Sequence, residues 1–123
     1  MHDFIDEKKL WENITFIPEY VKLDEALCAT DYLILPSLSE GLPCVLIQAQ
    51  CCGISCFVSS NVEKECNLGL CDFLDLSKGP VYWASQINSH YLKHNISRQI
   101  IDTSQWDKDS IILQYERIFN NER

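Results

Sequence analysis

The sequence has few basic residues and no long apolar run. Ten Lys and Arg stand against 18 Asp and Glu, and the net charge of −8 would repel nucleic acid and an anionic membrane surface alike. No apolar stretch approaches the roughly 20 residues of a membrane-spanning helix, and the acidic start MHDFIDEKK lacks the regions of a signal peptide. We therefore expect a cytoplasmic protein that does not bind nucleic acid.

The sequence also lacks a C-x-x-C pair, although it contains seven cysteines. Three interpretations of these cysteines are possible: a disulfide framework, a metal site, or reduced cysteines packed in the core. The count is odd and most neighbours are apolar, which favours core packing. His90 and His94 have a spacing that could hold a metal on a helix, but no third ligand stands near them in the sequence. We expect no bound metal.

What is present fits one folded domain. The chain has 123 residues, of which 46% are hydrophobic and 23% charged, as in ordinary globular proteins. Strands are predicted at 13–18, 32–37, 55–60 and, more weakly, 71–76, and helices at 23–31, 41–53, 80–92 and 107–119. This alternation indicates a parallel sheet covered on both faces. The predicted fold class is α/β, a Rossmann-like three-layer αβα arrangement with about four parallel strands.

The segment PSLSEG, residues 36–41, leaves the carboxyl end of the second predicted strand and leads into a helix. In open parallel sheets, ligands bind beyond the carboxyl ends of the strands. A helix N-terminus offers unpaired N–H groups, and Gly41 lets a ligand come close to the backbone. We therefore look for function first at Glu40 and Gly41.

Two amides interrupt the apolar helix that follows. Its periodicity predicts one face against the sheet, made of Leu42, Val45, Leu46, Ala49 and Gly53. Gln48 falls about 120° from Leu42, on a side that is nearly as apolar. We expect both sides to be buried, so that Gln48 needs a backbone or ligand partner. The pattern offers no explanation for Gln50.

Residues 31–60, DYLILPSLSEGLPCVLIQAQCCGISCFVSS, resemble the nucleotide-sugar-binding segment of bacterial retaining glycosyltransferases of the GT-B fold. That family carries a pattern like D-x-x-x-x-P-S-x-x-E-G-x-P-x-x-x-x-E-A-x-A-x-G-x-P. The matching positions are Asp31, Pro36, Ser37, Glu40, Gly41, Pro43, Ala49 and Gly53. Weaker similarity extends over nearly the whole chain, from NITFIPEYVKLDEAL to WDKDSIILQYERIF.

The resemblance implies a role for each matching position. Glu40 corresponds to the first Glu of an E-x7-E pair, which holds the donor sugar, and it is the catalytic candidate. The other implied substrate-binding residues are Ser37, Gly41, Leu42, Pro43 and Gln48. Gln48 stands where the family has the second Glu, which holds the ribose. A neutral amide in place of that carboxylate would weaken binding by about 1–2 kcal/mol.

The resemblance covers only the later part of the second of two Rossmann-like domains. We therefore expect residues 1–123 to be a single partial donor-binding domain of a longer bacterial enzyme. That enzyme would transfer a hexose, with retention and without a cofactor, from a UDP- or GDP-sugar to a surface polysaccharide or lipid-linked acceptor. It would lie in the cytoplasm or at the inner membrane face. The 123 residues alone would be inactive, because the acceptor domain and the cations that neutralise the leaving diphosphate are absent.

Two other hypotheses stay open. The first is a non-catalytic module that self-associates or pairs with another chain, for instance a homodimer through the predicted helix 107–119. That helix carries an apolar stripe of Ile111, Ile112, Tyr115, Ile118 and Phe119. The second is a cysteine-based redox protein, which rests only on the cysteine count.

Overall fold

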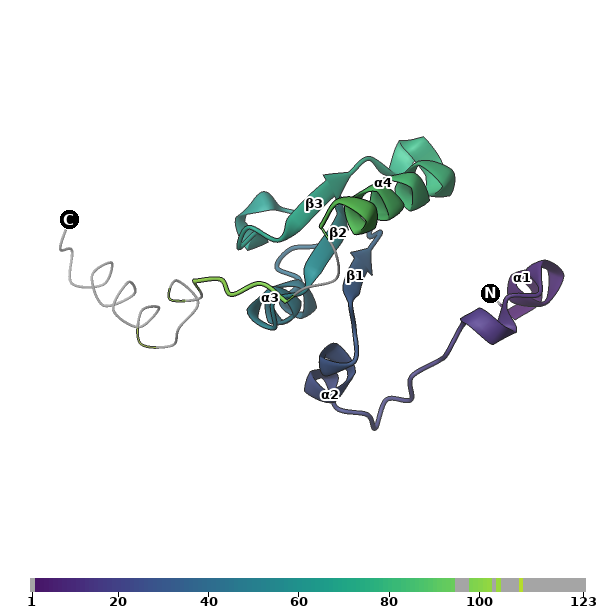
Figure 1. Cartoon of the computed structure of the whole chain (residues 1–123), viewed down its shortest axis with the longest axis horizontal. Coiled ribbons are helices and arrows are strands. Elements are labelled where there is room, and N and C mark those ends of the chain that lie inside the picture. Colours follow the sequence, from purple (N-terminus) through teal and green to yellow (C-terminus); the bar gives the residue numbers. More distant parts are fainter. Residues whose placement is uncertain (1, 95–97, 103, 105–108, 110–123) are drawn as a thin grey trace.

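The computed structural model describes residues 2–94, 98–102, 104 and 109. These residues form three parallel strands and four helices (Figure 1). In chain order they are α1 (His2–Lys8), α2 (Leu23–Cys28), β1 (Tyr32–Leu35), α3 (Cys44–Cys51), β2 (Ser55–Ser59), β3 (Cys71–Leu74) and α4 (Gly79–His94). Short 3-10 turns lie at Trp11–Asn13, Lys64–Cys66 and Leu76–Lys78. The apolar stripe of the predicted helix 107–119, with its proposed dimer contact, lies outside the described residues.

The sheet has the order β1-β2-β3, and both neighbouring pairs are parallel. Leu33 is in register with Cys56, and Val58 with Phe73. Every residue of β2 is buried, as expected for a strand that has a neighbour on each side and a helix on each face. The α/β class is confirmed, with three strands where about four were predicted.

The predicted strand 13–18 does not join the sheet. It forms the end of a 3-10 turn and an extended segment that pairs with no other described residue, and Phe16 and Ile17 are exposed. In the common doubly wound strand order 3-2-1-4-5-6, strands 2 and 1 lie between strand 3 and strand 4. Within the described residues, no strand lies between this segment and β1.

One helix packs on each face of the sheet. On one face, Leu46 and Ala49 of α3 pack with Cys56 and Val58 of β2. On the other face, Trp83 of α4 packs with Phe57 and Leu74. Side chains of successive strand residues point to opposite faces, which is why Phe57 and Val58 belong to different clusters. The result is the predicted three-layer αβα arrangement.

No helix within the described part of the chain has both the length and the apolar composition to cross a membrane.

The cysteines only partly follow the core-packing prediction. Cys56 and Cys66 are buried and Cys71 is half-buried, but the other four are exposed: Cys28, Cys44, Cys51 and Cys52. All seven are free thiols. The exposed ones lie in or beside α2 and α3, whose outer sides are not covered by other described elements. The prediction of core packing, which relied on apolar neighbours in the sequence, therefore overestimated the burial of these four cysteines.

Candidate functional site

The predicted site residues lie on the loop that joins β1 to α3. Pro36 follows the end of β1 at Leu35, and α3 begins at Cys44 after Pro43. Glu40 forms an isolated parallel bridge with Val62, which follows β2. This bridge brings together the connections that leave the carboxyl ends of two neighbouring strands. The loop is thus at the edge of the sheet where open α/β folds bind ligands.

Glu40 is exposed and its side chain is held by a neighbour in the same loop. The Ser37 hydroxyl Oγ donates to Oε1 of Glu40 at 2.9 Å. Within the described ranges, the other carboxylate oxygen, Oε2, has no hydrogen-bond partner. A carboxylate oriented through one oxygen can still accept hydrogen bonds from hydroxyl groups of a ligand. Ser37 therefore orients the Glu40 carboxylate, whose other oxygen can accept a hydrogen bond from a ligand.

The three residues after Glu40 differ in accessibility. A Cβ atom added at Gly41 would meet nothing within 4 Å, so the backbone there is open to an approaching molecule. Leu42 is half exposed, whereas Pro43 is buried. Pro43 is the residue before α3, offers no side-chain cap, and accepts the Leu46 N–H at 2.9 Å. Pro43 thus shapes the helix start, and Gly41 and Leu42 form the open surface.

Gln48 is exposed, so the prediction that it is buried and needs a partner was wrong. None of its side-chain atoms forms a hydrogen bond with another described residue. It lines a groove of about 240 Å³ between α2 and α3, together with Leu23, Asp24, Leu27, Cys51 and Cys52. The apolar side of α3 that carries Gln48 faces this groove and not a second packed layer. The amide therefore remains accessible to a ligand.

Gln50 is the buried amide that sequence reasoning left unexplained. It is fully buried in α3, and its Nε2 donates to the carbonyls of Cys66 at 2.8 Å and Leu46 at 3.1 Å. Its Oε1 accepts the N–H of Leu68 at 2.7 Å and of Leu70 at 3.4 Å. At 100° per residue, Gln50 is only about 40° from Leu46 around the helix. This closeness to Leu46 around the helix is the sequence signal that could have predicted the burial of Gln50.

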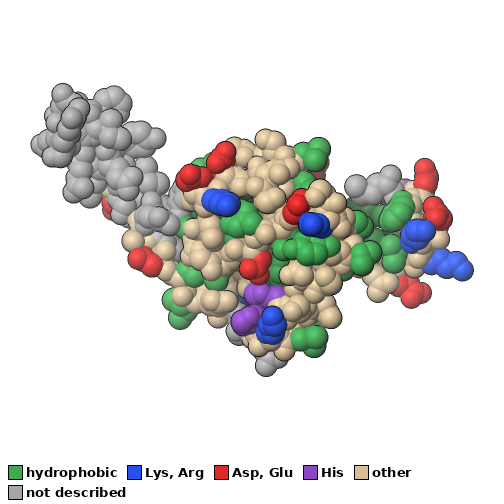
Figure 2. All heavy atoms as spheres, turned by 90° about the horizontal axis from the view of Figure 1, so that it is seen from above, with side chains coloured by type: hydrophobic (Ala, Val, Ile, Leu, Met, Phe, Trp, Pro, Cys, Tyr) green, Lys and Arg blue, Asp and Glu red, His purple; other side chains and the backbone are tan. Residues whose placement is uncertain are grey.

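The two spaced histidines form no metal site. His90 Nδ1 lies 3.1 Å from Asp72 Oδ2, and the rings of His90 and His94 are 4.7 Å apart. Figure 2 shows histidine side chains on the surface, beside acidic and basic groups. Across the described residues, no group of three or more His, Cys, Asp or Glu could hold a metal ion.

Cys66, a buried cysteine in the connection between β2 and β3, is poorly suited to redox catalysis. Burial raises the pKa of the Cys66 thiol, and the neighbouring groups of Cys71, Glu65 and Glu63 raise it further. Its Sγ donates to the carbonyl of Glu63 at 2.7 Å. A thiol with a raised pKa is protonated at neutral pH and is a poor nucleophile. Cys66 therefore acts in packing.

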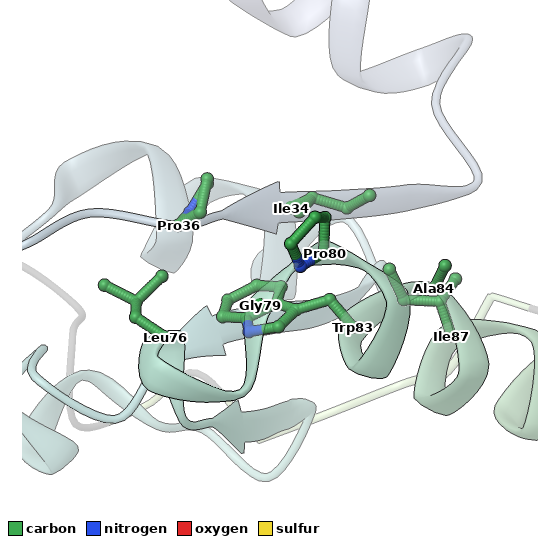
Figure 3. Close-up of a pocket in the computed structure, with 8 residues that line it drawn as sticks. All are labelled: Ile34, Pro36, Leu76, Gly79, Pro80, Trp83, Ala84 and Ile87. Carbon is green, nitrogen blue, oxygen red and sulfur yellow. The ribbon is translucent and has the colours of Figure 1, made fainter.

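A second groove, which we call the α4 groove, lies next to the site loop. It has a volume of about 420 Å³ and is lined by Ile34, Pro36, Leu76, Gly79, Pro80, Trp83, Ala84 and Ile87 (Figure 3). None of these side chains is charged. Pro36 belongs both to this groove and to the start of the loop that carries Glu40, but Glu40 does not line the groove. A polar donor molecule is a poor match for its apolar wall.

Comparison with known proteins adds sequence similarity to this geometry. Residues 1–67 match the family described as "Glycosyl transferases group 1". The chain is also 32% identical over 83 residues to "Putative glycosyltransferase EpsF" of Bacillus subtilis (strain 168). The aligned part is 66% of this chain and 22% of that relative, so the chain spans about a fifth of the relative's length. No solved structure matches the chain at a significant level.

Proposed function

This chain belongs to the glycosyl transferases group 1 family, and from that premise we propose that it is part of the donor-binding domain of a glycosyltransferase. The donor is a nucleotide-diphosphate sugar, and the loop between β1 and α3 binds it. The observation that carries the proposal is the pairing of Ser37 with Glu40 next to the open backbone of Gly41. A fixed carboxylate beside accessible N–H groups suits a molecule with several hydroxyl groups.

In this proposal Glu40 is the catalytic residue and accepts hydrogen bonds from hydroxyl groups of the sugar. The Gly41 and Leu42 backbone lies beside the same sugar, and Ser37 keeps the Glu40 carboxylate in place. Pro43 contributes by positioning the first turn of α3, because its own side chain is buried. The positive end of the α3 dipole favours the oxygen atoms of the donor at this point.

Gln48 and the groove between α2 and α3 are the proposed place of the nucleoside. The exposed amide can accept one ribose hydroxyl and donate to another. Leu23 and Leu27 supply apolar surface within the same groove. Without a charge-assisted bond, this contact is weaker than a carboxylate contact. We expect a low affinity for the nucleotide part.

The complete reaction also requires groups outside the loop that carries Glu40. A leaving diphosphate must be stabilised by cations as the sugar bond breaks, and residues 36–43 contain no Lys or Arg. We propose that a longer enzyme transfers the hexose, with retention, to a growing surface glycan or lipid-linked acceptor. The 123 residues alone bind the donor and do not transfer it.

Calorimetric titration with UDP-glucose and GDP-mannose tests this function. We expect weak, saturable binding of at least one of them, which Glu40→Gln reduces at least tenfold. Gln48→Glu is expected to tighten binding severalfold, because a charge-assisted bond replaces a neutral one. Glu63→Gln is the control, since Glu63 is also an exposed carboxylate near the carboxyl ends of the strands. Equal binding by Glu40→Gln and the unaltered chain would contradict the proposal.

A second candidate function is a non-catalytic module that pairs with another chain. One observation favours it: in the part of the chain that the structure describes, β1 has a strand neighbour on one side only. A binding role and a catalytic role are compatible if the partner supplies the missing part of the domain.

A further inference from the structure

The guanidinium of Arg98 contacts the carboxyl-terminal ends of two helices. Its Nη1 donates to the carbonyl of Cys52, the residue that follows α3, at 3.1 Å. Its Nη2 donates at 2.9–3.1 Å to three carbonyls in the last turn of α2 and just after it: Leu27, Cys28 and Thr30. These partners stand 46 to 71 positions before Arg98 in the sequence. One side chain therefore joins the end of α2 to the end of α3.

The chemistry of helix ends explains why a guanidinium suits this position. The last carbonyls of a helix lack partners within the helix and carry the negative end of its dipole. A guanidinium is charged at every physiological pH and holds its N–H donors in one rigid plane. Because Nη1 and Nη2 belong to the same planar group, the carbonyls of α2 and α3 that they contact are kept at a fixed separation. A lysine ammonium has no such plane.

The short helix α2 depends on such contacts for its position. It has six residues, and Leu27 is its one buried residue. A helix of this length is not stable alone and takes its place from packing. In contrast, α3 has three buried residues, Leu46, Ala49 and Gln50. We therefore regard α3 as the fixed reference, beside which Leu27 and Arg98 place α2.

The backbone next to Arg98 is attached to the end of α3. The N–H of Gln99 donates to the carbonyl of Gly53 at 3.1 Å. A Cβ atom added at Gly53 would strike the Gln99 backbone, so the two segments are in close contact. The Arg98 side chain therefore reaches α2 from a backbone that is already fixed beside α3.

The groove between α2 and α3 borders on this bridge. Arg98 holds the carbonyls of Leu27 and Cys52. Both of these residues also line the groove, as does Gln48. The groove has a volume of about 240 Å³, so a small displacement of α2 relative to α3 changes its width appreciably. The loop that carries Glu40 precedes the other end of α3, and the eight residues of this helix span about 12 Å.

We propose that Arg98 is a positioning residue for the nucleoside of the donor. By fixing the separation of α2 and α3, it sets the width of the groove and hence the affinity for a nucleoside diphosphate. Arg98 does not itself line the groove and acts through the two helices. This inference rests on the proposed place of the nucleoside beside Gln48. It assigns a role in donor binding to a residue that lies far along the chain from the loop that carries Glu40.

NMR titration of the ¹⁵N-labelled chain with UDP and with GDP tests the nucleoside end, because neither probe carries a sugar. We expect Arg98→Ala to weaken binding of the better probe at least fivefold and to reduce the shift of the Gln48 side-chain amide. Lys93→Ala removes one positive charge from an exposed position on α4 that does not line this groove, and it should bind like the unaltered chain. Arg98→Lys keeps the charge without the planar group, and we expect an affinity between those of Arg98→Ala and the unaltered chain.

The sugar end supplies a readout that a general loss of structure would also change. With UDP-glucose, Arg98→Ala should reach the same Gly41 shift at saturation as the unaltered chain, but at a higher ligand concentration. All titrations are made well below the unfolding temperature of each variant. Equal loss of the shifts at Gly41 and Gln48 would contradict a role confined to the groove, and full affinity in Arg98→Lys would contradict the need for a planar bridge.

Residual dipolar couplings test the positioning of α2 without a ligand. In the unaltered chain, the couplings of α2 and α3 should fit one alignment tensor, because Arg98 fixes the two helices to each other. In Arg98→Ala, the couplings of α2 should shrink while those of α3 and β2 stay the same. Unchanged couplings in α2, or equal nucleotide affinity of Arg98→Ala and the unaltered chain, would overturn the proposal. If the unaltered chain binds neither probe, the nucleoside site itself is refuted, and the couplings still decide whether Arg98 positions α2.

Discussion

The side-chain nitrogen Nε2 of Gln50 donates to the backbone carbonyl of Cys66 at 2.8 Å and so ties α3 to the connection between β2 and β3. The same amide accepts the Leu68 N–H through Oε1. Val62, at the start of this connection, forms the bridge to Glu40. Gln50 thus links the buried side of α3 to the connection that supports the loop of the candidate site.

The first prediction concerns this buried amide. Gln50→Leu removes the hydrogen bonds from this amide to the Cys66 carbonyl and the Leu68 N–H. Both backbone groups are then left without a partner, which should lower the free energy of unfolding by about 2–4 kcal/mol. Gln48→Leu is the matched control, because Gln48 is exposed on the same helix, and we expect a change within about 0.5 kcal/mol. Urea denaturation measures both. Similar losses for the two variants would contradict the assigned roles.

The second prediction compares two glycines. Gly53 ends α3 with a φ of +75°, and an added Cβ would strike the backbone of Gln99. Gly53→Ala should therefore destabilise the chain by about 1–2 kcal/mol or more. Gly41→Ala has open space around it and should change stability by less than about 0.5 kcal/mol, while it weakens donor binding. Thermal unfolding and calorimetric titration separate the two effects.

The third prediction concerns Arg98, whose guanidinium holds the C-terminal end of α2. It donates to the carbonyls of Leu27, Cys28 and Thr30, at 2.9–3.1 Å, and to that of Cys52 at 3.1 Å. Arg98→Ala should speed amide exchange over residues 23–30 at least tenfold, because the carbonyls lose a charged donor. Exchange in β2 serves as the internal reference. Unchanged exchange in α2 would show that the contact is dispensable.

The fourth prediction is a pH dependence at Cys66. Because burial raises the pKa of this thiol in the folded state, the folded chain favours the protonated form. The resulting stability is fully present below the ordinary thiol pKa of about 8.5 and is lost as the pH rises above it. We expect the unfolding free energy to fall as the pH rises above about 8.5, and to fall less in Cys66→Ala. A steeper fall in the variant would contradict this assignment.

Thiol labelling at pH 7 gives an independent check of the same environment. The four exposed cysteines should react with a disulfide reagent in the native chain, and Cys56, Cys66 and Cys71 only after unfolding. Fast native reaction of all seven would reopen the redox hypothesis.

The parts of the fold that the sequence predicted are those in which local pattern and environment agree. The pattern of Tyr32–Leu35 predicts a strand buried on both faces. These residues do pair as a strand with β2, but none is fully buried and Ile34 is 49% exposed. Residues 14–18 have the same local β preference, but a strand also needs a neighbour, and no described residue pairs with this segment. Local propensity cannot supply that information.

The position of the candidate loop in the fold was predicted, but the surroundings of its residues were not. The strand end, Glu40 and Gly41 could be located because ligand position in α/β sheets follows from topology. The roles of the two amides were exchanged: Gln50 is buried with four hydrogen-bond contacts, and Gln48 is exposed. An apolar pattern on several sides of a helix does not reveal which side faces the sheet. The partners of Gln50 lie 16 or more residues later in the sequence, except Leu46.

The most direct test of the donor-site proposal is an NMR titration of the ¹⁵N-labelled chain with UDP- and GDP-sugars, read at the Gly41 amide. We predict saturable shifts of Gly41 and of the first residues of α3, smaller shifts near Gln48, and loss of the Gly41 shift in Glu40→Gln. Unchanged Gly41 and Gln48 signals at millimolar donor concentrations would contradict the account.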